Sequence, residues 1–185
     1  MERGWSIAKR EFVVTETVGG VSLAQFLRDP NLGKVVTLSD KRKSIEHLAK
    51  LIRRLHDRGF VHGDLVATNI LVARDNAGEI EFYFMDNDRT KRYPSWLPQK
   101  LWRRNLIQLN RMPLALISLQ DRMRFLHAYF DVSSLGITEC RFARWLEART
   151  RQRRKECDGA DPNQNFRKLM RWVAETPEIK ALNQT

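Results

Sequence analysis

Five polar residues interrupt two short apolar stretches in the middle of the chain, residues 62–71 and 82–89. These residues are His62, Asp64, Asn69, Asp86 and Asp88. Burying a carboxylate costs several kcal/mol unless a partner compensates its charge. The side chains therefore either pair with one another inside the core or face a cleft where they hold a cation.

The spacing of these residues fits the transfer of a phosphoryl group from a nucleotide to a hydroxyl. The transition state of this reaction needs Mg²⁺ to neutralise its charge, and a carboxylate that orients the acceptor hydroxyl and takes its proton. Asp64 lies in a loop and is the candidate base. Asn69 lies where the chain re-enters a strand, and Asp86 ends the strand across a hairpin. Both can offer the oxygen ligands that Mg²⁺ prefers.

His62 is grouped with Asp64 as a candidate catalytic residue, in a supporting role. A histidine beside such a loop can hold backbone carbonyls or the second aspartate in place. The competing interpretation is that Asp64 and Asn69 only satisfy amides of their own loop, as Asp and Asn often do. The combined pattern of helix, loop, hairpin and strand-ending carboxylate favours phosphotransfer.

The elements that precede this cluster are predicted from composition and periodicity. Residues 11–18 are rich in Val and Thr and predict a strand that a Gly-Gly pair breaks. Ser22 can cap a short helix over residues 22–29. Apolar residues recur at the spacing of one buried stripe over residues 40–58, which predicts a helix that Gly59 ends.

A β-rich insert follows this helix and carries the polar cluster. Residues 60–62, 70–73 and 79–84 are short and rich in strand-forming residues. The turn sequence of residues 75–78 favours a hairpin between the last two of them.

From about Trp96 the chain is predicted to be helical to its end. The candidate helices span residues 97–111, 116–130, about 138–156 and 163–175. The expected fold is therefore mainly α with a small β-hairpin. The tryptophans near these helices sit at helical spacing from apolar neighbours, which favours core positions over stacking platforms. They are Trp96, Trp102, Trp145 and Trp172.

The 185 residues carry a formal net charge of +11, which favours an anionic partner. Much of the positive charge lies between residues 141 and 155. This segment is either a solvated helix face or a contact surface for phosphate or anionic lipid. No nucleic-acid partner is expected, because the sequence carries no RRM, zinc or helix-turn-helix signature.

The two cysteines, Cys140 and Cys157, are too few for a disulfide framework, which indicates a reducing compartment. No apolar run is long enough to span a bilayer. Residues 1–12 lack the apolar region of a signal peptide. A cytoplasmic location is therefore expected.

HGDLVATNILV and FYFMDNDR resemble the catalytic loop and the metal-binding segment of the protein-kinase-like fold. HGDL in place of HRDL is similar to the pattern of small-molecule kinases. Together with MDNDR, and with RFLHAYF downstream, it resembles the lipopolysaccharide kinase (Kdo/WaaP) family over about residues 10 to 130. VTETVGGVSLAQFL is similar to the last strand of the N-terminal lobe, the hinge and the first helix after it.

The resemblance implies roles by position. Asp64 would be the catalytic base, Asn69 and Asp86 would bind Mg²⁺ beside the nucleotide, and Asp88 would assist the metal. The implied acceptor is a sugar hydroxyl, on Kdo or heptose, of the lipid A–core oligosaccharide. Because that glycolipid lies at the anionic inner membrane, peripheral contact with the membrane surface is expected.

The resemblance also implies a division of the chain. Residues 1–20 would be a remnant of the N-terminal lobe with its hinge, whose backbone from Glu16 to Val18 would meet the adenine of ATP. Residues 21–185 would form the C-terminal lobe. The Gly-rich loop and strand lysine that such a kinase requires do not precede the hinge. We expect a truncated kinase, the alternatives being an inactive relative or a lobe supplied by another polypeptide.

A different class of function remains as an alternative. The chain could be a non-catalytic kinase-like module that binds an anionic partner through the basic helix near Arg149.

Overall fold

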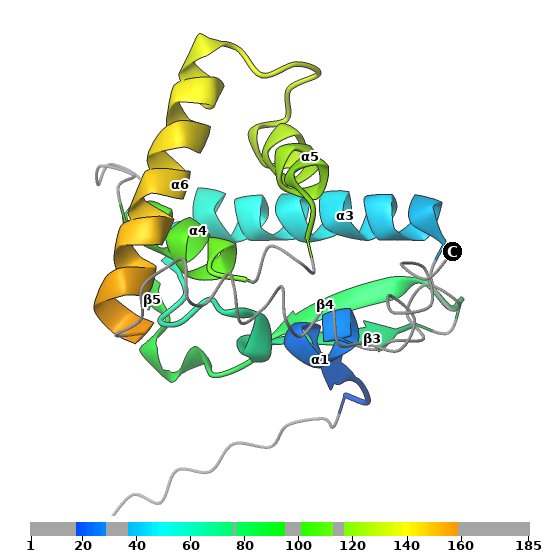
Figure 1. Cartoon of the computed structure of the whole chain (residues 1–185). Helices are drawn as coiled ribbons and strands as arrows, with labels where there is room; N and C mark the ends of the chain where they lie inside the picture. The colour runs from blue at the N-terminus through cyan, green and yellow to red at the C-terminus, as the bar shows by residue number, and fades with distance from the viewer. Residues whose placement is uncertain (1–17, 29–36, 76, 95–100, 113–116, 159–185) are drawn as a thin grey trace, which may run out of the picture.

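The computed structural model describes residues 18–28, 37–75, 77–94, 101–112 and 117–158, with side chains up to residue 154. The long helix α3 (Leu38–Asp57) lies between helix α5 (Leu119–Phe130) and a small antiparallel sheet (Figure 1). This arrangement confirms the predicted mainly α fold with a β-hairpin. None of the described helices is long and apolar enough to cross a membrane.

Helix α3 begins two residues before its predicted start, because Thr37 and Asp40 form a capping box. The Thr37 hydroxyl accepts from the Asp40 amide at 3.1 Å, and the Asp40 carboxylate accepts from the Thr37 amide at 3.3 Å. The helix stops before Gly59, which has a φ of +80°. A Cβ at this glycine would lie 2.2 Å from the carbonyl oxygen of Tyr93, so only a residue without a side chain fits next to Tyr93 at this position.

The predicted hairpin is formed by β3 (Ile70–Arg74) and β4 (Ile80–Phe84), paired antiparallel from end to end. Its turn is closed by Asp75, whose carboxylate accepts from the backbone amides of Ala77 at 2.9 Å and Glu79 at 2.8 Å. The inward residues of both strands are buried, and β4 packs against α3. The hairpin therefore fixes where its two ends, at residues 69 and 85, must lie.

Two further strand pairings were not predicted. Strand β1 (Val21–Ser22) adds to the free edge of β3, and β2 (Phe60–Val61) pairs with β5 (Lys91–Arg92). Strand β2 lies within the predicted stretch of residues 60–62, whereas β1 and β5 were not predicted, because two residues are too few for an alternating pattern to be visible. Gly20 allows β1 to approach, since a Cβ there would lie 2.4 Å from the carbonyl oxygen of Val72.

The remaining helices follow the predictions closely. Helix α1 (Leu23–Arg28) is capped by Ser22, whose hydroxyl accepts from the Gln25 amide at 3.2 Å. Helices α4 (Trp102–Asn110), α5 and α6 (Ile137–Asp158) correspond to three predicted helices. The predicted strand at residues 11–18 and helix at 163–175 lie outside the described residues.

An apolar core joins the hairpin to the helices. Its fully buried members are Ala49, Ile52, Leu65, Ile70, Leu106 and Tyr129. A group of aromatic rings, with centroids 5.3–5.7 Å apart, ties α4, α5 and α6 together. They are Trp102, Tyr129, Phe130, Phe142 and Trp145. Trp102 and Trp145 thus pack against the core as predicted, and Trp96 and Trp172 lie outside the described residues.

Candidate active site

The loop between β2 and β3 carries three of the predicted site residues. It runs from His62 through a short 3₁₀ turn, Ala67–Asn69, into β3. Leu65 in the middle of the loop is completely buried, which anchors the loop to the core. Asp64 and Asn69, on either side of this anchor, keep partly exposed positions.

His62 joins this loop to the end of strand β4. Its Nδ1 accepts a hydrogen bond from the Asp64 amide at 3.0 Å, and its Nε2 lies 2.9 Å from the carbonyl oxygen of Met85. Because an amide can only donate and a carbonyl can only accept, the imidazole must carry its proton on Nε2. The ring is almost fully buried, so it acts on the backbone rather than on a ligand.

Asn69 joins the same two segments. Its side-chain amide donates to the carbonyl oxygen of Asp64 at 3.0 Å, and its own carbonyl accepts from the Met85 amide at 2.9 Å. The side-chain nitrogen is thereby directed to the loop, which leaves the side-chain oxygen for another partner. His62 and Asn69 together hold the Asp64 loop beside the residue that precedes Asp86.

Asp86 lies in the left-handed region, with φ 58° and ψ 55°. This conformation is uncommon for a residue with a side chain, although aspartate adopts it more readily than most, and residues in such conformations cluster at active sites. The carboxyl of Asp88 raises the pKa of Asp86, first through a hydrogen bond and then through charge repulsion. A cation between the two side chains would favour the ionised form of Asp86.

The donor set can be tested against Mg²⁺. Within the described part of the chain, no three His, Cys, Asp or Glu side chains gather into a complete metal site. Mg²⁺ is usually held by one or two carboxylates, with waters and substrate phosphates completing the octahedron. The neighbouring carboxylates of Asp86 and Asp88 and the side-chain oxygen of Asn69 fit that partial donor set.

The residue between His62 and Asp64, Gly63, has no room for a side chain. A Cβ at this position would lie 2.2 Å from the Cβ of Arg89 and 3.0 Å from its backbone. The loop that carries Asp64 and the segment that carries Asp86 and Asp88 are therefore in direct contact.

Two residues of helix α4 hydrogen-bond to the loop that carries His62 and Asp64, and neither was predicted from the sequence. Asn105 is completely buried; its oxygen accepts from the His62 amide at 2.9 Å and its nitrogen donates to the His62 carbonyl at 2.7 Å. Gln108, one turn later, donates to the Asp64 carboxylate at 2.9 Å. Two amides three residues apart, each followed by a leucine of the core, were a signal available in the sequence.

The Asn105 side chain also connects the loop to the helical body. Its oxygen lies 3.2 Å from the Nε2 of His56, and the Nδ1 of His56 lies 2.8 Å from the hydroxyl of Tyr129. Burial lowers the pKa of His56 to about 4. A neutral imidazole is thus enclosed between α3, α4 and α5.

The predicted adenine-binding residues are only partly described. Glu16 lies outside the described residues, and Val18 is exposed just before β1. The face of the sheet formed by Ser22, Leu71 and Tyr83, which pair across the strands, begins beside Asn69. Tyr83 is exposed on this face, and Leu71 is partly exposed.

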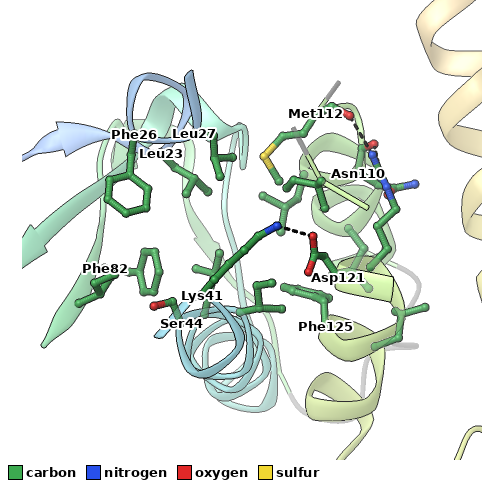
Figure 2. Close-up of a pocket in the computed structure, with 18 of the residues that line it drawn as sticks. Leu23, Phe26, Leu27, Lys41, Ser44, Phe82, Asn110, Met112, Asp121 and Phe125 are labelled. Atoms are coloured by element: carbon green, nitrogen blue, oxygen red, sulfur yellow. Dashed lines mark hydrogen bonds and ion pairs between the residues drawn. The ribbon is translucent and has the colours of Figure 1, made fainter. Parts of the chain in front are cut away.

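A separate cavity of about 330 Å³ lies between α1, α3, β4 and α5, away from the polar cluster. Figure 2 shows Phe26, Phe82 and Phe125 directed into it from different elements. Lys41 and Asp121 form an ion pair of 2.6 Å in its wall. Burial would raise the pKa of Asp121, but hydrogen bonds from Lys41 and Ser118 hold it below the usual value.

The arginines of α6 divide into two groups. Several form internal contacts: Arg151 pairs with Glu147 at 2.8 Å, and Arg149 bonds to Gln152 at 2.9 Å. Arg154 donates to the carbonyls of Asn110, the last residue of α4, and Met112 beyond it. Arg141 and Arg144 are exposed. The side chain of Lys155 lies outside the described residues.

Comparison with known proteins identifies the class. The sequence model of the lipopolysaccharide kinase (Kdo/WaaP) family matches residues 1–129, so the chain belongs to this family. No curated protein matches the sequence at a significant level.

The fold is similar to that of a solved structure of WaaP, described as WaaP in complex with acyl carrier protein. The TM-score is 0.60 at 20% sequence identity, over 74% of this chain and 58% of the WaaP chain. The chain thus spans somewhat more than half of the WaaP structure that it matches.

Proposed function

We propose that the chain carries the phosphotransfer site of a kinase that uses ATP and Mg²⁺ to phosphorylate a sugar hydroxyl, on Kdo or heptose, of the lipopolysaccharide core. Membership of the family supports this class of reaction. The observation that carries the proposal is the double link of His62 and Asn69. Each contacts both the Asp64 loop and Met85, the residue before Asp86.

The chemistry assigns a role to each side chain of the cluster. Asp64 orients the acceptor hydroxyl and takes its proton as the oxygen attacks the γ-phosphorus. The bond between that phosphorus and the bridging oxygen breaks, and the products are a phosphomonoester and ADP. Asn69 and Asp86, with Asp88 beside it, would hold Mg²⁺, which would neutralise the charge on the phosphates. His62 holds the loop and takes no proton.

The test separates binding from chemistry in the complete chain. Asp64→Asn should lower phosphate transfer from ATP to rough lipopolysaccharide by roughly 100-fold or more, and leave Mg-ATP binding intact. Asp86→Ala should abolish Mg²⁺-dependent nucleotide binding in a calorimetric titration. If wild-type protein binds no Mg-nucleotide, or if Asp64→Asn transfers phosphate at the wild-type rate, the assignment is wrong.

The division of the chain belongs to the same proposal. Residues 1–20 would contain the last strand of the N-terminal lobe and the hinge, and residues 21–185 would form the C-terminal lobe. The order of long helix, loop, hairpin and paired carboxylates supports it.

A non-catalytic function is the alternative, and exposure of Arg141 and Arg144 on α6 favours it. The chain would then bind an anionic partner without transferring phosphate. If Asp86→Ala leaves binding to an anionic membrane intact while Arg141→Glu/Arg144→Glu removes it, and no turnover is measured, this alternative replaces the first.

The cavity between α1, α3 and α5 supports a second candidate partner. The WaaP structure with the similar fold is described as a complex with acyl carrier protein. Most residues that line the cavity are apolar. We propose that an acyl chain enters this space. Ile45→Trp, which narrows it, should weaken binding of acylated carrier protein, and Arg42→Trp on the exposed face of α3 should not. Equal binding of acylated and unacylated carrier protein would argue against it.

A further inference from the structure

Gln108 makes four polar contacts, and all of them are to the proposed catalytic loop or its support. Its Nε2 lies 2.9 Å from the Oδ1 of Asp64 and 3.4 Å from the carbonyl oxygen of Gly63. Its Oε1 accepts from the Leu65 amide at 3.3 Å and from the side chain of Asn105 at 3.1 Å. A side-chain amide has two donors and two acceptor sites, so the capacity of this residue is fully used.

The orientation of this amide follows from its neighbours. The Leu65 amide can only donate, so the oxygen of Gln108 must face it. The Gly63 carbonyl can only accept, so the nitrogen must lie on the opposite side, toward Asp64. The reversed amide would direct its oxygen at both a carbonyl and a carboxylate, which is repulsive.

Helix α4 is rigidly placed at this point, which makes the contact geometrically defined. Leu106 and Leu109, on either side of Gln108, are buried in the core. Asn105, one turn earlier, binds both the amide and the carbonyl of His62. A side chain carried by an element fixed in this way can hold its partner within a narrow range of positions.

We propose that Gln108 is a positioning residue for the base of the phosphotransfer reaction. By donating to Oδ1 of Asp64 it fixes the plane of the carboxylate and leaves Oδ2 for the acceptor hydroxyl. The inference rests on the proposed function, and it assigns a role to a residue beyond the family motif. A displacement of the base by about 1 Å can cost roughly 100-fold in rate.

If Gln108 had only a structural role, its variants would affect kcat differently, because the two ends of the amide contact different partners. The oxygen holds the backbone of Leu65, and the nitrogen holds the side chain of Asp64. Gln108→Glu keeps the oxygen end, removes the donor and places a second carboxylate against Asp64. Gln108→Met keeps the length of the side chain and removes both ends.

The experiment compares these variants in the complete chain, with Gln120→Glu on the exposed start of α5 as the matched control. We expect Gln108→Glu to lower kcat for lipopolysaccharide phosphorylation by about 10-fold to 100-fold, at least as much as Gln108→Met. The KM for ATP should stay within about twofold of the wild-type value. If Gln108→Glu retains kcat while Gln108→Met loses it, the residue serves only the loop backbone and the inference is overturned.

A double-mutant cycle measures the contact without activity. In Asp64→Asn/Gln108→Glu the polarity is exchanged, since residue 64 becomes the donor and residue 108 the acceptor. We expect this double variant to unfold at a higher temperature than the sum of the single shifts predicts. Additive shifts would mean that the two side chains do not interact, and would overturn the inference whatever the kinetics show.

The outcomes also separate the inference from the function on which it rests. A wild-type chain that transfers phosphate, together with a Gln108→Glu variant of unchanged kcat, overturns the inference alone. If the double-mutant cycle shows coupling but the wild-type chain transfers no phosphate, the proposed function is wrong, and so is the role assigned to Gln108.

Discussion

At the scale of single residues, the proposed site depends on side chains whose hydrogen-bonding groups are already committed. His62 uses both ring nitrogens for backbone contacts, and Asn105 uses both ends of its amide. Such residues restrict where Asp64 can lie, and they would take no part in proton transfer themselves. Substitutions among them should therefore change geometry before they change chemistry.

Gly63→Ala tests the close approach between the loop and the carboxylate segment. The added Cβ would meet the Cβ and backbone of Arg89. We expect a loss of roughly 1–3 kcal/mol in unfolding free energy, measured by urea denaturation, and weaker Mg-ATP binding. Gly19→Ala is the control for stability, because a Cβ there meets nothing within 4 Å. Wild-type stability in Gly63→Ala would mean that the two segments are not in contact.

His56 should make the stability of the chain depend on pH. Burial lowers its pKa from 6.5 to about 4 in the folded state, so the unfolded chain binds more protons between these values. The contribution is complete above pH 6.5 and is lost as the pH falls toward 4, by on the order of 3 kcal/mol. Thermal unfolding of the wild type and of His56→Gln across this range should show a shallower slope for the variant. Parallel slopes would contradict the assignment.

At the scale of elements, the long helices, the hairpin and strand β2 could be predicted, whereas strands β1 and β5 could not. Periodicity and flanking caps are visible over the twenty residues of α3, and the Asp75 turn identifies the hairpin. Strands β1 and β5 exist because β3 and β2 offer them free edges, which is a property of the assembled sheet. The acids of the cluster were visible in the sequence because they interrupt apolar stretches. Asn105 and Gln108, like β1 and β5, acquire their role only in the assembled fold, when α4 packs against the loop.

The capping box of α3 is a local feature whose contribution can be measured. Thr37→Ala removes the acceptor for the Asp40 amide and should lower the unfolding free energy by about 1 kcal/mol. Thr37→Ser keeps the hydroxyl and should remain close to the wild type. Urea denaturation of the three proteins checks this order. If alanine and serine are equally stable, the cap does not contribute to the stability of α3.

At the scale of the whole molecule, the net charge of +11 makes association with anionic membranes testable. Each basic residue near such a surface contributes about 1 kcal/mol. Arg141→Glu/Arg144→Glu should therefore weaken co-sedimentation with phosphatidylglycerol vesicles by at least about tenfold. Vesicles of phosphatidylcholine alone should bind neither protein.

The control for this experiment has the same change in net charge at a different place. Arg42→Glu/Lys43→Glu reverses two exposed charges on α3, away from α6. A clearly smaller loss in this variant would assign the contact to α6. An equal loss in both variants would show that only the total charge matters.

The pairing of β2 with β5 also has a consequence for how the chain could be engineered. It fastens residue 60 to residue 92, and the Tyr93 amide adds a bond of 2.8 Å to the carbonyl of Gly59. All residues proposed to contact the ATP phosphates lie in the one continuous segment between these points, which the pairing closes at its base. Peptides inserted at the far end of that segment, at the turn after Asp75, should leave this closure intact and phosphate binding unchanged.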